Sequence, residues 1–142
     1  MDKIIAACGN DCSVCPRHLP KTQEELLQTS ELWYKIGYRN QIVSTTEISC
    51  SGCSADNWCR YKIINCVIEK GVSTCGECPE YICEKIQECF DVTESFRRTC
   101  KMNCSRAEYE VLVEAFFQKK KNLDLICGKN RVNFAIEELN IQ

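Results

Sequence analysis

The chain has 142 residues and a formal net charge of −2 at pH 7, with 44% hydrophobic and 27% charged residues. This length fits one domain over residues 1–142, and this composition excludes an intrinsically disordered chain. An acidic chain is also a poor candidate for nucleic-acid binding, which depends on positive charge facing the phosphates. The unusual feature is the 14 cysteines, a level at which sulfur chemistry must contribute to the fold.

The N-terminal segment does not resemble an export signal. Its apolar run from Ile4 to Ala7 is shorter than the roughly 7–15 residues of a secretory signal core. No stretch reaches the roughly 20 apolar residues of a membrane-spanning helix. We therefore expect a soluble cytoplasmic protein without membrane contact, whose cysteines stay reduced and bind metal instead of forming disulfides.

Apolar residues at helical spacing predict two helices in the first half of the chain. One covers about 23–38 and begins at a capping box formed by Thr22 and Glu25. The other lies near 60–70 and is followed by Gly71, a residue type that readily adopts the left-handed conformation after a helix. Both helices are amphipathic, which indicates packing on a common core.

The second half is also predicted to be helical. A helix is expected at about 80–90, and a strong amphipathic helix begins at a capping box of Ser105 and Glu108. The apolar stripe of that second helix indicates core packing and not a cofactor site. The tail at 131–139 fits a helix or a strand, and a helix is favoured.

Three groups of closely spaced cysteines mark the functional part of the sequence. They are Cys8, Cys12 and Cys15; Cys50 and Cys53; and Cys75, Cys78 and Cys83. Two cysteines separated by two residues can present both sulfurs to one tetrahedral metal, at about 2.3 Å from each. Gly52 and Gly76 lie inside such pairs, where glycine permits a tight backbone turn. Several such pairs in one chain predict metal binding, with zinc as the expected metal.

About two zinc ions can be accommodated. One scheme combines two tetrads, Cys12, Cys15, Cys50 and Cys53 in the first, and Cys66, Cys75, Cys78 and Cys83 in the second. Cys8 and Cys59 are substitutes for any member, and a cross-braced arrangement fits almost as well. Four thiolates and one Zn²⁺ add about −2 in charge per site, so two sites bring the net charge to about −6.

This scheme predicts a mainly α, cysteine-rich domain stabilised by metal, with helices packed around zinc-knuckle loops. Residues 1–90 form its metal-binding part, and residues 91–142 form a C-terminal helical part. Four cysteines remain outside the tetrads, and we expect them to be buried free thiols, although a third metal site is an alternative. They are Cys89, Cys100, Cys104 and Cys127.

An iron–sulfur cluster is the alternative cofactor. Cys8, Cys12 and Cys15 have the C-x3-C-x2-C spacing with which radical-SAM enzymes hold a [4Fe–4S] cluster, but the alternation of strands and helices of those enzymes is absent. His18 is the single histidine, and we expect it on the exposed surface. With one histidine, no Ser-His-Asp or Cys-His arrangement is supported, and no catalytic residue is predicted.

The order of the motifs resembles a known family. The motifs are Cys8-Gly9-x2-Cys12-x2-Cys15, Cys50-x-Gly52-Cys53, and Cys66-x2-Glu69-Lys70-Gly71-x3-Cys75-x2-Cys78-x2-Tyr81-x-Cys83. Over residues 3–90 the chain is similar to the bacterial and archaeal domain of unknown function 3795. The resemblance implies a cysteine-rich, zinc-binding domain with no established activity. The chain departs from that pattern at Ile82, where proline is usual, and at Tyr61, near the place of a further cysteine.

Three functional classes follow. The leading hypothesis is a zinc protein that is not an enzyme, in which the metal is structural and the domain serves as an interaction module for a protein partner. The first alternative is an iron–sulfur or thiol-based redox enzyme, suggested by Cys8, Cys12 and Cys15 and by the surplus thiols. The second alternative is a zinc-ribbon nucleic-acid binder, which the acidic charge disfavours.

Overall fold

The computed structural model describes residues 3–19, 22–50, 52 and 61–129. Its helices are η1 (Cys12–Val14), α1 (Gln23–Lys35), α2 (Thr45–Ile48), α3 (Ile63–Lys70), η2 (Cys75–Glu77), α4 (Glu84–Ser95), α5 (Arg97–Asn103), α6 (Arg106–Phe116) and a C-terminal helix described over residues 119–129. In these ranges the β pairing is limited to an isolated bridge between Ile5 and Asp11. The predicted mainly α fold is confirmed. None of the described helices is long and apolar enough to cross a membrane.

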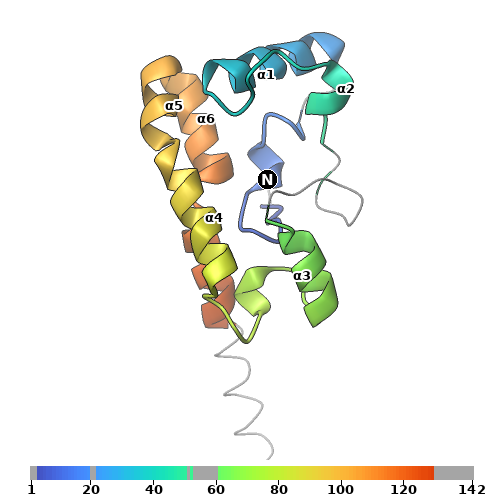
Figure 1. Ribbon diagram of the computed structural model, residues 1–142, viewed down its shortest axis with the longest axis vertical. Coiled ribbons are helices and arrows are strands. Elements are labelled where there is room, and N and C mark those ends of the chain that lie inside the picture. The colour runs from blue at the N-terminus through green and yellow to red at the C-terminus, as the bar shows by residue number, and fades with distance from the viewer. Residues whose placement is uncertain (1–2, 20–21, 51, 53–60, 130–142) are drawn as a thin grey trace, which may run out of the picture.

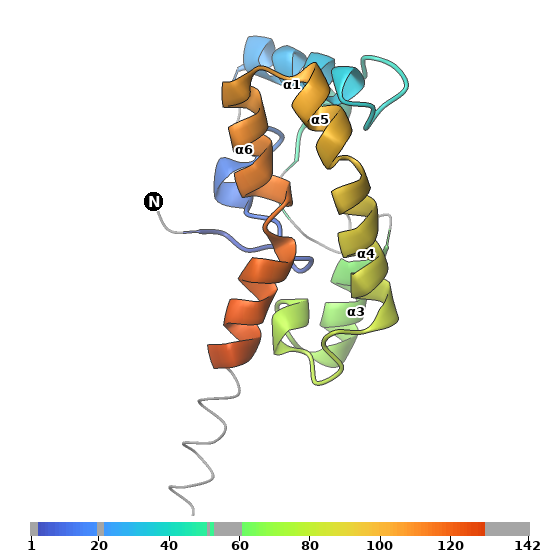
Figure 2. The same cartoon turned by 90° about the vertical axis from the view of Figure 1, so that its left-hand side faces the viewer.

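The helices form two columns that run side by side. One column is α4 followed by α5, and the other is α6 followed by the C-terminal helix (Figures 1 and 2). Helices α1 and α2 lie across one end of the columns, and α3 and η2 lie at the opposite end. The N-terminal segment with η1 lies between these two ends (Figure 1). The cysteine-bearing turns are therefore held on one side of the columns.

The two predicted capping boxes have different outcomes. At α6 the reciprocal bonds are both present, since Ser105 Oγ accepts from the backbone N–H of Glu108 and the Glu108 carboxylate accepts from that of Ser105. At α1 the Thr22 hydroxyl accepts from the backbone N–H of Glu25 at 3.1 Å, but the Glu25 carboxylate binds the Thr22 hydroxyl instead of its backbone. Each cap satisfies a helix N–H that would otherwise lack a partner.

The helix boundaries partly follow the sequence. Helix α1 ends at Lys35, before Gly37 with φ 86°, and α3 ends at Lys70, before Gly71 with φ 72° as predicted. Helix α4 begins only at Glu84, so Ile82 lies outside it and is 42% exposed. The short helices α2 and α5 were not predicted, and the tail at 131–139 lies outside the described residues.

Two clusters of buried side chains form the core. The first cluster packs α1, α6 and η1 together, and its buried members are Cys15, Leu26, Trp33, Ile36, Val43, Ile48, Cys100, Leu112, Ala115 and Phe116. The second cluster packs α3, η2, α4 and the C-terminal helix together, and its buried members are Ala7, Ile63, Val67, Cys75, Ile86, Cys89, Phe90 and Leu123. Cys15 of the first C-x-x-C pair therefore lies in the first cluster, and Cys75 of another pair lies in the second.

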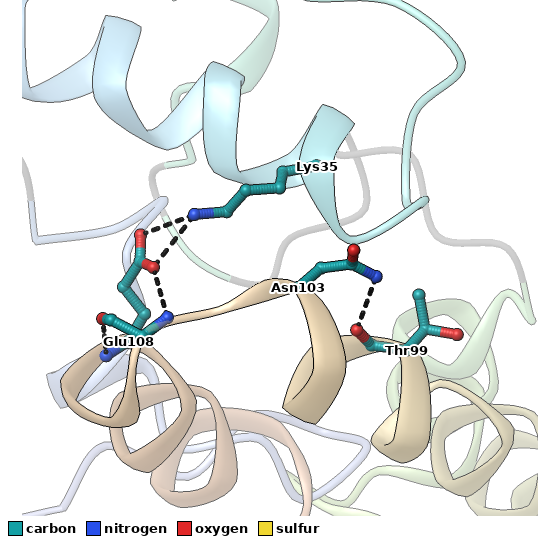
Figure 3. A network of polar contacts seen from close by, with 5 residues as sticks. Lys35, Thr99, Asn103 and Glu108 are labelled. Atoms are coloured by element: carbon teal, nitrogen blue, oxygen red, sulfur yellow. Dashed lines mark hydrogen bonds and ion pairs between the residues drawn. The ribbon is translucent and has the colours of Figure 1, made fainter.

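A polar contact at the surface joins the end of α1 to the start of α6. Lys35, at the end of α1, forms an ion pair with Glu108 near the start of α6, with 3.0 Å between Nζ and Oε1 (Figure 3). Nearby, the amide of Asn103 donates to the backbone carbonyl of Thr99 at 2.9 Å (Figure 3). The ion pair ties the end of α1 to the first turn of α6, whereas the Asn103 hydrogen bond lies within α5.

Candidate metal centre

The first C-x-x-C pair lies on the tight turn η1. The backbone N–H of Cys15 donates to the carbonyl of Cys12 at 3.3 Å, so both cysteines belong to one turn. The Asp11 carboxylate, 3% exposed, caps this turn by accepting from the backbone N–H and the hydroxyl of Ser13 at 3.0 and 2.6 Å. The backbone N–H of Asp11 donates to the carbonyl of Ala115 at 2.9 Å, which fastens η1 to α6.

The second pair lies on η2 and has the same backbone hydrogen bond. The N–H of Cys78 donates to the carbonyl of Cys75 at 3.1 Å, and the N–H of Cys75 donates to the carbonyl of Ala7 at 3.0 Å. A Cβ atom on Gly76 would lie 2.7 Å from the carbonyl oxygen of Leu123 in the C-terminal helix. This glycine is therefore required by the close approach of a helix and not by a left-handed conformation.

A proline extends the likeness between the two turns. Pro16 and Pro79 each follow the second cysteine of the pair, and proline favours the second position of a tight turn. In each case the residue two positions after the proline donates its backbone N–H to the carbonyl of that cysteine, His18 at 3.0 Å and Tyr81 at 3.1 Å. Two distant segments thus repeat one local structure, which we call the C-x-x-C-P turn. The sequence carried this signal in the two Cys-Pro steps.

The segment that carries Cys50 is hydrogen-bonded to the first C-x-x-C-P turn. The backbone N–H of Cys50 donates to the carbonyl of Arg17 at 3.1 Å. Burial is the main cause that raises the pKa of the Cys15 thiol, and negative charge on Cys50 raises it further. Gly52 has φ 106°, the left-handed conformation that was expected inside this cysteine pair.

His18 is half-buried, although an exposed position was expected. Its Nδ1 lies 3.1 Å from the carbonyl oxygen of Cys50. Because a carbonyl oxygen only accepts, Nδ1 carries the proton in this contact, and in the neutral ring Nε2 keeps its lone pair. His18 thereby joins the first C-x-x-C-P turn to the segment that carries Cys50.

The second C-x-x-C-P turn is surrounded by a larger group of cysteines. Burial is the main reason why the pKa of Cys75 rises to about 12, and negative charge on four nearby cysteines raises it further. In decreasing order of effect these are Cys83, Cys8, Cys66 and Cys78. Cys66 comes from α3, and Cys83 immediately precedes α4. Cys8 and the members of the predicted second tetrad therefore lie in one region of the structure, and their sharing of a metal ion stays a prediction.

The cysteine sulfurs in these two regions do not surround a common point. In the part of the chain that the structure describes, no three side chains of cysteine, histidine, aspartate or glutamate meet closely enough to hold a metal ion. Cys53, assigned to the first tetrad, and Cys59, assigned as a substitute, lie outside the described residues. The turns and their neighbours are in place, and the coordination of metal stays a prediction.

Cys8 makes a contact that the sequence did not predict. Its thiol is hydrogen-bonded to that of Cys89, which lies 3% exposed on the inner face of α4. This hydrogen bond is the largest cause that lowers the pKa of Cys8, to about 6, with smaller effects from the Lys119 charge and the backbone N–H of Asn10, while burial opposes the shift. The inward position of Cys89 could be read from its helical spacing with Ile86, but its partner could not.

The other cysteines outside the tetrads do not form a group. Cys100 is fully buried in the first cluster and is hydrogen-bonded to the hydroxyl of Tyr38, whereas Cys89 belongs to the second cluster. Cys104 and Cys127 are only partly buried. Since Cys89 and Cys100 lie in different clusters, the four cysteines are not arranged as a third metal site.

Comparison with known proteins identifies the family of the chain. A family model described as "Protein of unknown function (DUF3795)" matches residues 4–88, which is more than half of the chain. No curated protein and no solved structure matches the chain. The matched segment contains both C-x-x-C-P turns and the cysteines gathered around them. The chain belongs to the DUF3795 family.

Proposed function

We propose that this protein binds about two zinc ions in structural, all-cysteine centres, one at each C-x-x-C-P turn. The observation that carries the proposal is the repetition of this turn, each copy meeting cysteines from distant segments. The first centre comprises Cys12, Cys15, Cys50 and Cys53, and the second comprises Cys66, Cys75, Cys78 and Cys83. Cys8, whose charge also acts on Cys75, is the substitute ligand of the second centre.

The chemistry of the donor set supports zinc. Zinc is held in structural sites by four thiolates in a tetrahedron, and a pair of cysteines two residues apart supplies two adjacent corners. Without metal, the surroundings of Cys75 hold its thiol in the protonated form, since its pKa is raised to about 12. A divalent cation reverses this preference by compensating the negative charge of the clustered sulfurs. Metal binding is therefore expected to release protons and to draw the gathered sulfurs together.

Zinc would supply cohesion at the places where chain segments meet. Metal binding by structural zinc sites contributes roughly 10–16 kcal/mol of apparent free energy, which is comparable with the roughly 5–15 kcal/mol net stability of a whole domain. In the second centre, one ion would join α3, η2 and the start of α4. Four thiolates leave no open coordination position for a substrate, so the metal has a structural role and the domain acts as an interaction module for a protein partner.

Removal of the metal tests this proposal. The purified full chain is titrated with a zinc chelator while bound zinc and far-ultraviolet circular dichroism are followed together. We expect the loss of about two zinc ions and, with them, a loss of helical signal that zinc restores. Unchanged helicity after complete metal loss would contradict a structural role. Visible absorption at the start of the titration would instead reveal the [4Fe–4S] alternative.

A further inference from the structure

A cleft lies between the two columns of helices that stand side by side in Figure 2. Residues of α4 between 87 and 94 form one wall, and residues between 116 and 120, from the end of α6 to the start of the C-terminal helix, form the other. The volume of the cleft is about 230 Å³, whereas a cavity of about 150 Å³ is enough for one benzene ring. The cleft therefore has room for a small organic molecule.

The inner surface of the cleft is aromatic. Phe90, from the second core cluster, and Phe116, from the first, are each 9% exposed. The Phe117 ring is partly buried, and the Arg97 guanidinium lies over it, 4.6 Å from the ring centroid. Both columns therefore offer aromatic contacts to the apolar part of a ligand.

Lys119 places a buried positive charge beside these rings. The residue is 8% exposed, and its Nζ donates to the carbonyl of Phe116 at 3.2 Å and lies 5.5 Å from the centroid of the Phe116 ring. In the described part of the chain, no carboxylate lies within ion-pair distance of this ammonium group. A lysine is almost never so deeply buried without an opposite charge. Because an ammonium group has three donors, two of them remain for a ligand.

The other charged groups of the cleft have a partner or are exposed to solvent. The Glu94 carboxylate is paired with Arg97 at 2.6 Å, and Lys120 is paired with Asp124 at 2.7 Å. Asp91 is exposed. The buried ammonium group therefore attracts an anion, while the two carboxylates that line the cleft disfavour a group with more than one negative charge.

We propose that this cleft binds a small monocarboxylate with an apolar body of about one ring. The ligand carboxylate accepts hydrogen bonds from the Lys119 ammonium group, and the apolar body packs against Phe90 and Phe116. The bond to Lys119 is charge-assisted and lies away from bulk water, which makes it stronger than an exposed one. The site lies outside the two zinc centres, because none of their described ligands lines the cleft.

A nuclear magnetic resonance titration of the isotope-labelled full chain tests this proposal, with phenylacetate as the probe. We expect saturable shifts of the backbone amides within residues 87–94 and 116–120. Benzylamine has the same ring and methylene group with the opposite charge, and inorganic phosphate has negative charge without an apolar body, so neither should produce these shifts. Unsaturable shifts, saturable shifts centred on other residues, or equal binding of benzylamine or phosphate would overturn the proposal.

Two substitutions test the charge and the space separately. In Lys119→Met the probe should bind at least about tenfold more weakly, since hydrogen bonds to a charged group are lost. Lys121→Met is the matched control, because Lys121 is an exposed lysine of the same helix that does not line the cleft, and binding should be unchanged.

Thr93→Trp fills the cleft from α4 and should abolish the saturable shifts. It leaves the Lys119 charge, which also acts on Cys8, in place, so it decides the outcome if Lys119→Met does not fold. Wild-type affinity for phenylacetate in Thr93→Trp, or in folded Lys119→Met, would contradict the proposed site.

Discussion

The two C-x-x-C-P turns share the same pattern of backbone hydrogen bonds but lie in different surroundings. The first turn packs into a cluster with an aromatic centre, in which the Trp33 ring makes edge contacts with Tyr38 and Phe116, each at 5.7 Å between ring centroids. The second turn packs into a smaller, mostly aliphatic cluster, in which Phe90 is the buried aromatic residue. It is instead surrounded by sulfur, since four other cysteines act on Cys75.

This difference indicates that apolar packing and metal binding contribute in different proportions to the stability of the two regions. A large apolar cluster contributes free energy of folding without metal, because each fully buried apolar side chain is worth roughly 1.5–3 kcal/mol. The region of the second turn has less of this contribution and more thiolate ligands. Zinc is therefore expected to be more important for the second region than for the first.

The largest effect is expected when one ligand of the second centre is removed. Cys78→Ser should abolish binding of one of about two zinc ions and melt α3 together with the start of α4, because roughly 10–16 kcal/mol of metal-binding free energy is lost there. Cys15→Ser is the matched variant in the first turn, and it should lose one zinc ion while the aromatic cluster keeps its helices. Native mass spectrometry and amide hydrogen exchange measure both effects. Equal loss of structure in the two variants would refute the division between the regions.

A second prediction concerns the contribution of the apolar cluster around the first turn to stability. Trp33→Ala should lower the free energy of unfolding by about 3–5 kcal/mol, since Trp33 is 3% exposed and its removal leaves a cavity between α1 and α6. Urea denaturation measures the change. The variant should keep the zinc ion of the second centre, and loss of that ion would show that the two clusters depend on each other more than their separate packing indicates.

Gly76→Ala tests the packing of the second turn by adding a single methyl group. The added Cβ would meet the carbonyl oxygen of Leu123 at 2.7 Å, so η2 or the C-terminal helix must move, at a cost of about 1–3 kcal/mol. Gly128→Ala is the control, because an added Cβ there meets no atom within 4 Å, and a helical alanine is favoured by about 0.5–1 kcal/mol. Thermal unfolding distinguishes them, and similar changes of the same sign would contradict the close approach.

The smallest effect concerns the surface ion pair of Figure 3. Lys35→Met removes the partner of Glu108, but both side chains are more than a third exposed. Exposed ion pairs contribute roughly 0–1 kcal/mol and are screened by salt. The loss measured by urea denaturation should therefore stay within that range and decrease at high ionic strength. A larger loss that does not respond to salt would mean that the Lys35 stem contributes packing.

Local patterns predicted much of the fold. The capping box at Ser105, the left-handed Gly71 and the inward face of α4 depend on residues within a few positions of one another, so the sequence alone displays them. The start of α4 was predicted too early, because the segment after Cys78 continues the C-x-x-C-P turn before the helix begins. The short helices α2 and α5 carry too few residues to establish a periodicity.

The candidate site could be predicted only in part, and its metal ligands stay a prediction. Spacing alone identified the pairs that share a turn, since two intervening residues limit the separation of the sulfurs. The meeting of Cys50 with Cys15, and of Cys8 with Cys89, depends on how distant segments pack. The sequence also does not show why residue 76 must be glycine, because the helix that approaches it lies more than 40 residues further along the chain.

Native mass spectrometry of the full chain, purified under reducing conditions with zinc supplied, tests the central claim most directly. The account predicts a folded protein whose mass exceeds that of the bare chain by about two zinc ions, and whose excess mass disappears on denaturation in acid as the thiolates take up protons. A folded protein with the mass of the bare chain and undiminished helicity would contradict it.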